Sequence, residues 1–362
     1  MKSWWPALLA LLAGIIYAGI RMAPADFDPV ALAEVGPRYA ELDPAADPGY
    51  DGQFTLFIAL NPDPAVVASH LDVPAYRYQR ILLPIAARIL SFAQPGIIPW
   101  MLLFINLASI GIGTRLLTLL VIERGFSPGY ALIYGLWVGI IAPVGLDLHE
   151  PLAYALVILA LYLHGRGRFI PAAVAAGLAL FAKETTLPFW LVLLVVGSNQ
   201  ARGNSRTWFA LAGLAFLGWQ AWLWTTFGSP GIGSGGDMAT SFELIPYMGL
   251  WRIGIHGWRV LLLFAVIFVP TIVVPSAWGI LSTTRSMLRE STLDRDTLVL
   301  LLNSLLIAFA PHSTFREPLG IVRLADGMVL GLILYSTHRA KERVLNYAYF
   351  WIAFLFLLVQ QT

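Results

Sequence analysis

The residues from Pro48 to Arg80, PGYDGQFTLFIALNPDPAVVASHLDVPAYRYQR, form the most polar long segment that lies between apolar segments of membrane length. This segment contains an acid flanked by turn residues, Asp51, and two arginines three residues apart, Arg77 and Arg80. The chain as a whole is 58% hydrophobic and only 12% charged. A soluble protein of 362 residues needs far more charge to cover its surface. The sequence therefore predicts a single integral membrane domain over residues 1–362.

Apolar runs of membrane length recur along the whole chain and predict an all-α polytopic membrane protein with about eleven transmembrane helices. A large first outer loop, residues 23–96, separates the first two spans, and residues 228–256 form a Gly-rich outer loop. Within the first loop, residues 78–93 have one apolar face, which predicts a helix lying on the membrane surface, with a spanning helix as the alternative. The predicted spans cover residues 4–22, 97–121, 127–145, 151–164, 169–182, 186–198, 207–227, 258–281, 297–312, 319–338 and 345–361.

The charged residues indicate an orientation. With a cytoplasmic N-terminus, alternate short loops carry basic residues such as Arg124, Arg166 and Arg339, as cytoplasmic loops do. The net charge of +2 is too small to indicate a nucleic-acid partner. The chain has no Cys, which excludes disulfides, thiol catalysis and Cys-ligated metals.

Five groups of charged residues at span ends fall on the non-cytoplasmic side of this topology. Charges beside a membrane are costly and usually face a cavity or a partner. Their position on one side favours a single site that faces outward. The groups are Asp51, then Arg77 with Arg80, Asp147 with Glu150, Lys183 with Glu184, and Arg316 with Glu317 and Arg323.

Asp51 is the candidate general base, since Gly49 and Gly52 allow tight backbone geometry and close approach of a substrate. The alternative is an aspartate that only forms a turn. On a helix Arg77 and Arg80 share one face, where two guanidinium groups suit a phosphate. The alternative is that they extend to lipid headgroups.

The next two groups have open roles. Asp147 and Glu150, with His149 between them, are candidates for contacts to substrate hydroxyls, for a divalent-cation site, or for pairing with the arginines. The alternative for Asp147 is a structural ion pair. Lys183 and Glu184 interrupt an apolar run, and we weigh a phosphate-binding lysine against a salt bridge.

The last group follows His312. Arg316 and Arg323 are seven residues apart, so a continuing helix aligns them, although Pro318 favours a break or a helix start. With Glu317 between them they form a candidate anion site at a helix end. The alternative is a salt bridge from Arg323 to Asp326.

The motifs are YDGQF around Asp51, the apolar run FTLFIA, the helix RILLPIAARIL, and then DLHEPLA, AKET and REPLG. With these, the sequence resembles the GT-C superfamily of integral membrane glycosyltransferases, in architecture over most of the chain and in motif over the first third. The order of an acid, an amphipathic stretch, a Pro-containing helix and a second span is similar to that of the GPI and dolichol-linked mannosyltransferase branch. The wording is also similar to uncharacterised bacterial membrane proteins of that superfamily. A departure from the paired acids of many members is that the nearest acid before Asp51 is Asp47.

The resemblance implies an inverting glycosyltransferase at the outer face of a bacterial inner (plasma) membrane, with a polyprenyl-phosphate-linked sugar as donor and a glycan, lipid or protein as acceptor. Asp51 is then the base, Glu150 contacts the sugar, and residues 228–241 close over the acceptor. No cofactor is implied with certainty, and a divalent cation stays open. The alternatives are a transporter or flippase of a lipid-linked anion and a non-catalytic subunit of an envelope glycan assembly complex. The residues expected to hold the phosphate are Arg77, Arg80, Arg316, Arg323 and Lys183.

Overall fold

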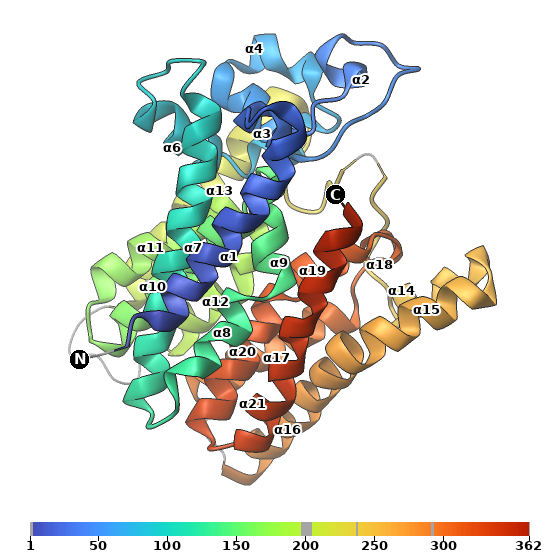
Figure 1. The fold of residues 1–362 in the computed structure, drawn as a ribbon. Helices are drawn as coiled ribbons and strands as arrows, with labels where there is room; N and C mark the ends of the chain where they lie inside the picture. Colours follow the sequence, from blue (N-terminus) through green and yellow to red (C-terminus); the bar gives the residue numbers. More distant parts are fainter. Residues whose placement is uncertain (1–2, 197–204, 237, 291–292, 362) are drawn as a thin grey trace.

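The computed structural model describes residues 3–196, 205–236, 238–290 and 293–361, and all regular elements in this part are helical. The predicted all-α class is therefore confirmed. The N-terminal helix α1 (Trp5–Met22) packs along α7 (Ile98–Glu123). Helix α7 packs in turn on α10 (Glu150–Gly165), and α10 packs on α11 (Phe169–Ala182), so these four elements form one side of the bundle (Figure 1).

Four helical stretches are long and apolar enough to cross a membrane: Trp5–Ala25, Ile98–Glu123, Trp258–Glu290 and Pro318–His338. A fifth crossing arises if Pro128–Gly135 and Val138–Leu146, which meet at a 59° bend, form one span. The apolar helices at predicted spans 151–164, 169–182 and 186–198 are shorter than a membrane span, and residues 197–198 lie outside the described part. The structure thus supports four or five spans and does not confirm eleven.

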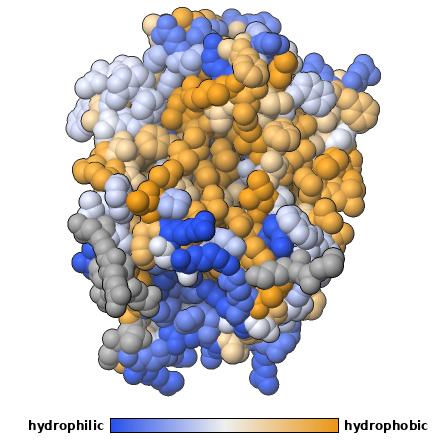
Figure 2. All heavy atoms as spheres, turned by 90° about the vertical axis from the view of Figure 1, so that its left-hand side faces the viewer, coloured by the Kyte–Doolittle hydropathy of each residue, from blue (hydrophilic) through white to orange (hydrophobic). Residues whose placement is uncertain are grey.

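The surface of the bundle is banded. Figure 2 shows apolar side chains gathered across the middle of one face, with hydrophilic side chains at both ends. At the end where α7 terminates, Arg124 pairs with Asp296 at 2.5 Å, and Arg339 pairs with Glu290 at 2.6 Å. An apolar band between two polar ends is the pattern of a protein that crosses a membrane.

The first loop folds into short helices at the other end of the bundle (Figure 1). Residues 78–93, predicted as one amphipathic helix, contain the last residue of α5 (Pro74–Tyr78) and the nine-residue helix α6 (Leu82–Leu90), which packs on α3 (Gly52–Leu60) and α7. Nine residues extend about 14 Å, far less than the roughly 30 Å of a hydrocarbon core. Helix α6 is therefore too short to cross a membrane by itself, and it is not among the four helical stretches that could do so. The helices of this loop are α2 (Pro37–Ala40), α3 (Gly52–Leu60), α4 (Pro64–Val67), α5 (Pro74–Tyr78) and α6 (Leu82–Leu90).

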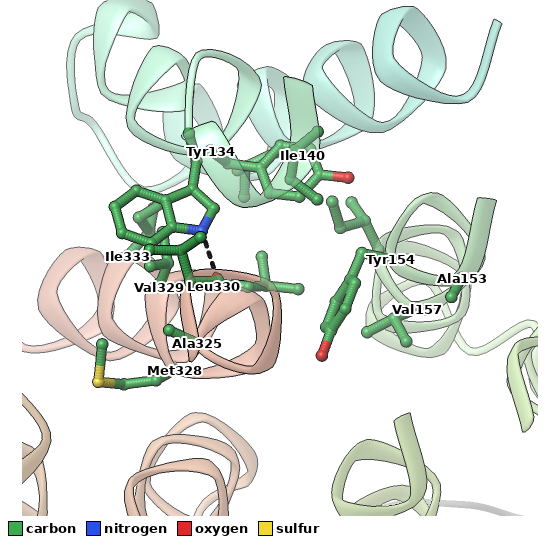
Figure 3. Packing of buried hydrophobic residues seen from close by; sticks show 14 of the residues in the cluster. Tyr134, Ile140, Ala153, Tyr154, Val157, Ala325, Met328, Val329, Leu330 and Ile333 are labelled. Carbon is green, nitrogen blue, oxygen red and sulfur yellow. Dashed lines mark hydrogen bonds between the residues drawn. The ribbon is translucent and has the colours of Figure 1, made fainter. Parts of the chain in front are cut away.

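The main core lies where α8 (Leu132–Gly135), α9 (Val138–Ile141), α10 and α20 (Asp326–His338) meet. Figure 3 shows side chains of these helices, among them Tyr134, Tyr154 and Val329, directed toward one another. The indole of Trp137 donates to Val322 O at 3.1 Å and to Asp326 Oδ1 at 2.9 Å. This core holds the start of α10 beside α19 (Pro318–Leu324), which carries one of the predicted site residues, Arg323.

The second half of the chain is also helical, and a long loop interrupts it between α13 and α14. In that loop, residues 228–236, which follow α13 (Ser205–Phe227), pass over α5, and within residues 238–247 Thr240 lies at α18 (His312–Arg316). Gln220 accepts from Gly231 N at 2.8 Å, and Thr240 N donates to Ser313 Oγ at 3.0 Å. The helices are α12 (Leu187–Val196), α13 (Ser205–Phe227), α14 (Met248–Trp251), α15 (Trp258–Phe268), α16 (Val274–Glu290), α17 (Arg295–Ala308), α18 (His312–Arg316), α19 (Pro318–Leu324) and α21 (Glu342–Ala348).

Candidate functional site

Asp51 lies at the N-terminus of α3, where an aspartate usually accepts from a backbone amide of the first helical turn. Its side chain makes no such capping bond. Instead, Asp51 Oδ1 accepts from Arg77 Nη2 at 2.8 Å, and Asp51 Oδ2 lies 3.6 Å from Arg323 Nη2. The alternative of a merely turn-forming aspartate does not account for these long-range ion pairs.

Two glycines fix the backbone around Asp51. Gly49 has a φ of +64°, and a Cβ there would lie 2.4 Å from Glu34 O. A Cβ on Gly52 would lie 2.1 Å from Leu146 O. The predicted close approach is therefore present, but it is the protein's own backbone, and not a substrate, that approaches these glycines.

Arg77 is held by two carboxylates and two rings. Its guanidinium donates to Asp72 twice, from Nε and from Nη2, both at 2.7 Å, as well as to Asp51. The guanidinium carbon lies 4.3 Å from the Phe54 ring centroid and 5.1 Å from that of Tyr76. Arg77 therefore does not extend to lipid headgroups, and its position is set before any ligand binds.

Arg80 makes a two-bond contact with Glu184, from Nε to Oε2 at 2.9 Å and from Nη2 to Oε1 at 2.5 Å. It also donates to the Tyr76 hydroxyl. Lys183, the neighbour of Glu184, donates to Glu150 Oε1 in the buried interior. The salt-bridge alternative for Lys183 and Glu184 thus holds in this structure. Both ion pairs belong to one group of charged side chains near Asp51, hereafter called the cluster.

Arg323 joins the two halves of the cluster. Its Nε lies 3.0 Å from Glu150 Oε1, and its Nη1 donates to the Tyr50 hydroxyl at 3.1 Å. Tyr50 in turn donates to Glu317 at the exposed rim. Asp326 accepts from Trp137 and makes no ion pair with a described residue, so the alternative of an Arg323–Asp326 salt bridge is wrong.

The structure brings most of the predicted residues together and separates two. Arg316 is exposed and makes no hydrogen bond or ion pair within the described ranges, so nothing joins it to the cluster. Asp147 is fully buried in a left-handed conformation (φ +48°), and neither carboxyl oxygen has a hydrogen-bond partner among the described residues. The alternative of a structural ion pair for Asp147 is therefore not found among the described residues. The predicted residues in the cluster are Asp51, Arg77, Arg80, Glu150, Lys183, Glu184, Glu317 and Arg323.

Three residues of the cluster were missed as site residues by the sequence analysis. Asp72 carries no motif, and only the loop fold brings it to Arg77. Tyr76 and Tyr50 were not singled out as site residues, yet their hydroxyls accept hydrogen bonds from Arg80 and Arg323, respectively. A usable signal for Tyr50 and Tyr76 was their position one residue away from Asp51 and Arg77.

The buried charges of the cluster balance, and Glu317 lies apart from them at the exposed rim. Arg77, Arg80, Lys183 and Arg323 have side chains that are 10% exposed or less. Four carboxylates pair with these four cations, and the Asp51 side chain, at 30%, is the most exposed of the four. The carboxylates are Asp51, Asp72, Glu150 and Glu184.

The balance fixes the ionisation of Asp51. Burial raises its pKa, but the guanidinium groups of Arg77 and Arg323 outweigh this effect and hold the pKa well below its ordinary value. Asp51 is therefore a carboxylate at neutral pH. By contrast, burial raises the pKa of Asp147 well above its usual range, and burial lowers the pKa of His149 to about 3, so these two side chains are neutral.

A small hollow opens beside Asp51, with room for about one water molecule. Its polar wall consists of side chains from α3, from α5 and the turn after it, and from the segment before α10; its apolar wall comes mainly from α3 and α6. The Thr55 hydroxyl lies 3.1 Å from His149 Nε2, and His149 Nδ1 has no partner among the described residues. The polar lining residues are Asp51, Thr55, Arg77, Arg80 and His149.

Within the described residues, no group of three His, Asp or Glu side chains is placed to hold a metal ion. The divalent cation left open by the sequence therefore has no assigned ligands. No family model, curated protein or solved structure matches the chain.

Proposed function

We propose that this protein is an inverting glycosyltransferase that moves a sugar from a polyprenyl-phosphate donor to an acceptor hydroxyl. The observation that carries the proposal is Asp51, a partly exposed carboxylate that contacts two buried arginines beside a hollow. This arrangement supplies a proton acceptor and anion-binding cations within one site.

In the proposed reaction, the acceptor oxygen attacks the anomeric carbon from the face opposite the phosphate. The proton of the acceptor hydroxyl passes to the Asp51 carboxylate while the bond between the anomeric carbon and the phosphate oxygen breaks. The electron pair stays on the phosphate, where Arg77, Arg80 and Arg323 offset the added negative charge. A single displacement of this kind inverts the anomeric centre.

The other members of the cluster support these groups. Glu150 contacts both Lys183 and Arg323 through Oε1, while its Oε2 has no hydrogen-bond partner among the described residues. That free oxygen supports a role for Glu150 in accepting a hydrogen bond from a sugar hydroxyl. Lys183 then acts as a positioning residue that holds the glutamate.

The location of the cluster favours an enzyme over a transporter. Binding sites of transporters lie near the bilayer midplane, on broken helices between repeated halves. Here Asp51, Glu150 and Lys183 lie next to or at the ends of α3, α10 and α11, and Arg323 lies in the first two turns of its span. We propose that this end of the bundle is the outer side of a bacterial inner membrane, where the acceptor is a glycan, lipid or protein.

The test measures sugar transfer in proteoliposomes from a panel of polyprenyl-phosphate sugars, with crude envelope lipids and glycans as acceptors. Asp51→Asn should lower the rate by ~10²–10⁴-fold, because a positioned base contributes that much. The matched control is Glu41→Gln, which removes one exposed carboxylate from the same loop and should leave the rate unchanged.

Transfer by the Asp51→Asn variant at the wild-type rate would remove Asp51 from the mechanism. Absence of transfer from every donor, together with movement of a donor between leaflets, would establish the transporter instead. Absence of both, in a protein that stays folded, would favour the non-catalytic subunit.

A further inference from the structure

The hollow beside Asp51 has the chemistry of an anion site. Two guanidinium groups, Arg77 and Arg80, line it together with the Thr55 hydroxyl and the neutral His149 ring. All four side chains are at least nine-tenths buried, and His149 Nδ1 lacks a hydrogen-bond partner within the described part of the chain. Buried donors of this kind suit a tetrahedral oxyanion, which accepts several hydrogen bonds at once.

The hollow is too small for such an anion as long as Asp51 occupies its present position. A phosphate group is several times larger than the single water molecule for which there is room. Asp51 is both a lining residue and the partner of Arg77. The carboxylate therefore occupies the guanidinium face that an incoming anion needs.

Asp51 is also the carboxylate that is held least firmly. It receives one hydrogen bond from Arg77, whereas Asp72 receives two from the same guanidinium, and Glu184 receives two from Arg80. The Asp72 side chain is 7% exposed and that of Asp51 is 30% exposed. Stacking on Phe54 keeps the Arg77 guanidinium in place when one carboxylate leaves.

We propose that the hollow binds a phosphate-type anion and that this anion replaces the Asp51 carboxylate on Arg77. The inference rests on the proposed function for the identity of the anion as a lipid-linked phosphate. After the exchange, Asp51 has lost its closer ion-pair partner and keeps Arg323 at 3.6 Å, so its carboxylate accepts a proton more readily. Donor binding thereby activates the base, and Asp51 serves as a counter-ion until the donor arrives.

The test measures equilibrium binding to the full-length protein in detergent micelles by isothermal titration calorimetry. The probes are farnesyl phosphate, farnesol and inorganic phosphate. Asp51→Asn should bind farnesyl phosphate about tenfold more tightly than the wild type, because the competing charge is gone. The matched control is Glu41→Gln, which removes an exposed charge from the same loop but outside the cluster and should change the affinity by less than twofold.

Farnesol should bind all variants equally weakly. If inorganic phosphate also gains affinity in Asp51→Asn, the exchange is supported and the phosphate group alone suffices; a gain confined to farnesyl phosphate supports it with the lipid as source. Unchanged or weaker binding by a folded Asp51→Asn protein overturns the proposal, and so does an equal gain in Glu41→Gln.

A second variant keeps the proposal testable if Asp51→Asn does not fold. Thr55→Val keeps the shape of the side chain but removes a hydroxyl from the hollow, and should weaken binding of farnesyl phosphate by roughly 2–10-fold. Unchanged binding in this variant overturns the assignment of the hollow. Sugar transfer is measured in parallel. If the protein transfers sugar but Asp51→Asn does not bind the anion more tightly, only the proposed exchange is rejected. If Asp51→Asn binds the anion more tightly but the wild type transfers no sugar, only the proposed glycosyltransferase function is rejected.

Discussion

Gly52→Ala changes no charged residue and yet should disable the site. A Cβ at position 52 would lie 2.1 Å from Leu146 O, 3.0 Å from Leu146 C and 3.3 Å from Ala33 Cα. The nearest of these atoms belongs to the backbone, so it cannot turn away as the end of a flexible side chain can. To restore an ordinary contact, α3 and the segment around Leu146 must separate by about 1 Å.

That displacement acts directly on the preceding residue, Asp51. A shift of about 1 Å away from Arg77 would lengthen the 2.8 Å bond between Asp51 Oδ1 and Arg77 Nη2 beyond hydrogen-bond range. Overpacking of this kind costs about 1–3 kcal/mol of stability, and a misplacement of about 1 Å can cost ~10²-fold in rate. We therefore expect both a lower unfolding temperature and a large loss of sugar transfer.

The assay compares Gly52→Ala with Gly111→Ala, a matched control within α7 where a new Cβ meets no atom within 4 Å. The control should be neutral or more stable by up to about 1 kcal/mol, since alanine favours a helix. Thermal unfolding and sugar transfer are measured for both variants. The prediction would be refuted if Gly52→Ala unfolded at the same temperature as the wild type and transferred sugar at a rate within twofold of the wild-type rate.

Three further substitutions test the surroundings of the site. Arg80→Met should destabilise the protein by about 3 kcal/mol because Glu184 loses its buried partner, and adding Glu184→Gln should restore part of this, as measured by unfolding in denaturing detergent. Folding raises the pKa of Asp147, so the wild type loses stability as the pH rises above the unfolded pKa, which is about 4. Asparagine carries no such penalty, so the stability of Asp147→Asn relative to the wild type should be greater at pH 7 than at pH 4. Thermal unfolding of both proteins at both pH values measures this difference. Trp137→Phe should cost about 1–3 kcal/mol because Asp326 loses its buried donor, and a change below 0.5 kcal/mol, roughly that of a surface substitution, would contradict this.

The sequence predicted the members of the site better than the shape of the membrane domain. Charges that interrupt apolar runs fall at or near helix ends, and helix ends on one side of a bundle lie close together. Glu150, Lys183 and Arg323 were found in this way, and they are in contact. Asp72 was not found, because its contact with Arg77 depends on how the first loop folds.

The number of membrane spans could not be predicted from the apolar runs, for a different physical reason. An apolar run reports burial, but burial inside the bundle and exposure to lipid give the same composition. Helices α10 and α11, of 16 and 14 residues, are shorter than a span although their sequences are as apolar as one. Asp147 shows the same limit, since nothing in its spacing distinguished a neutral buried acid from a ligand.

The balanced charge of the cluster explains why one residue has two roles. Four buried cations without counter-ions would be costly beside a membrane, so carboxylates must hold them before a substrate binds. A carboxylate held in this way is a weak base, and it becomes a stronger one only when an anion takes over its cation. The two proposals therefore predict opposite signs for binding and turnover in Asp51→Asn: the anion binds more tightly while transfer falls. Loss of Arg77 should instead lower both, because that guanidinium serves the anion in every state. A purely structural ion-pair network would show neither pattern, since its variants change stability alone.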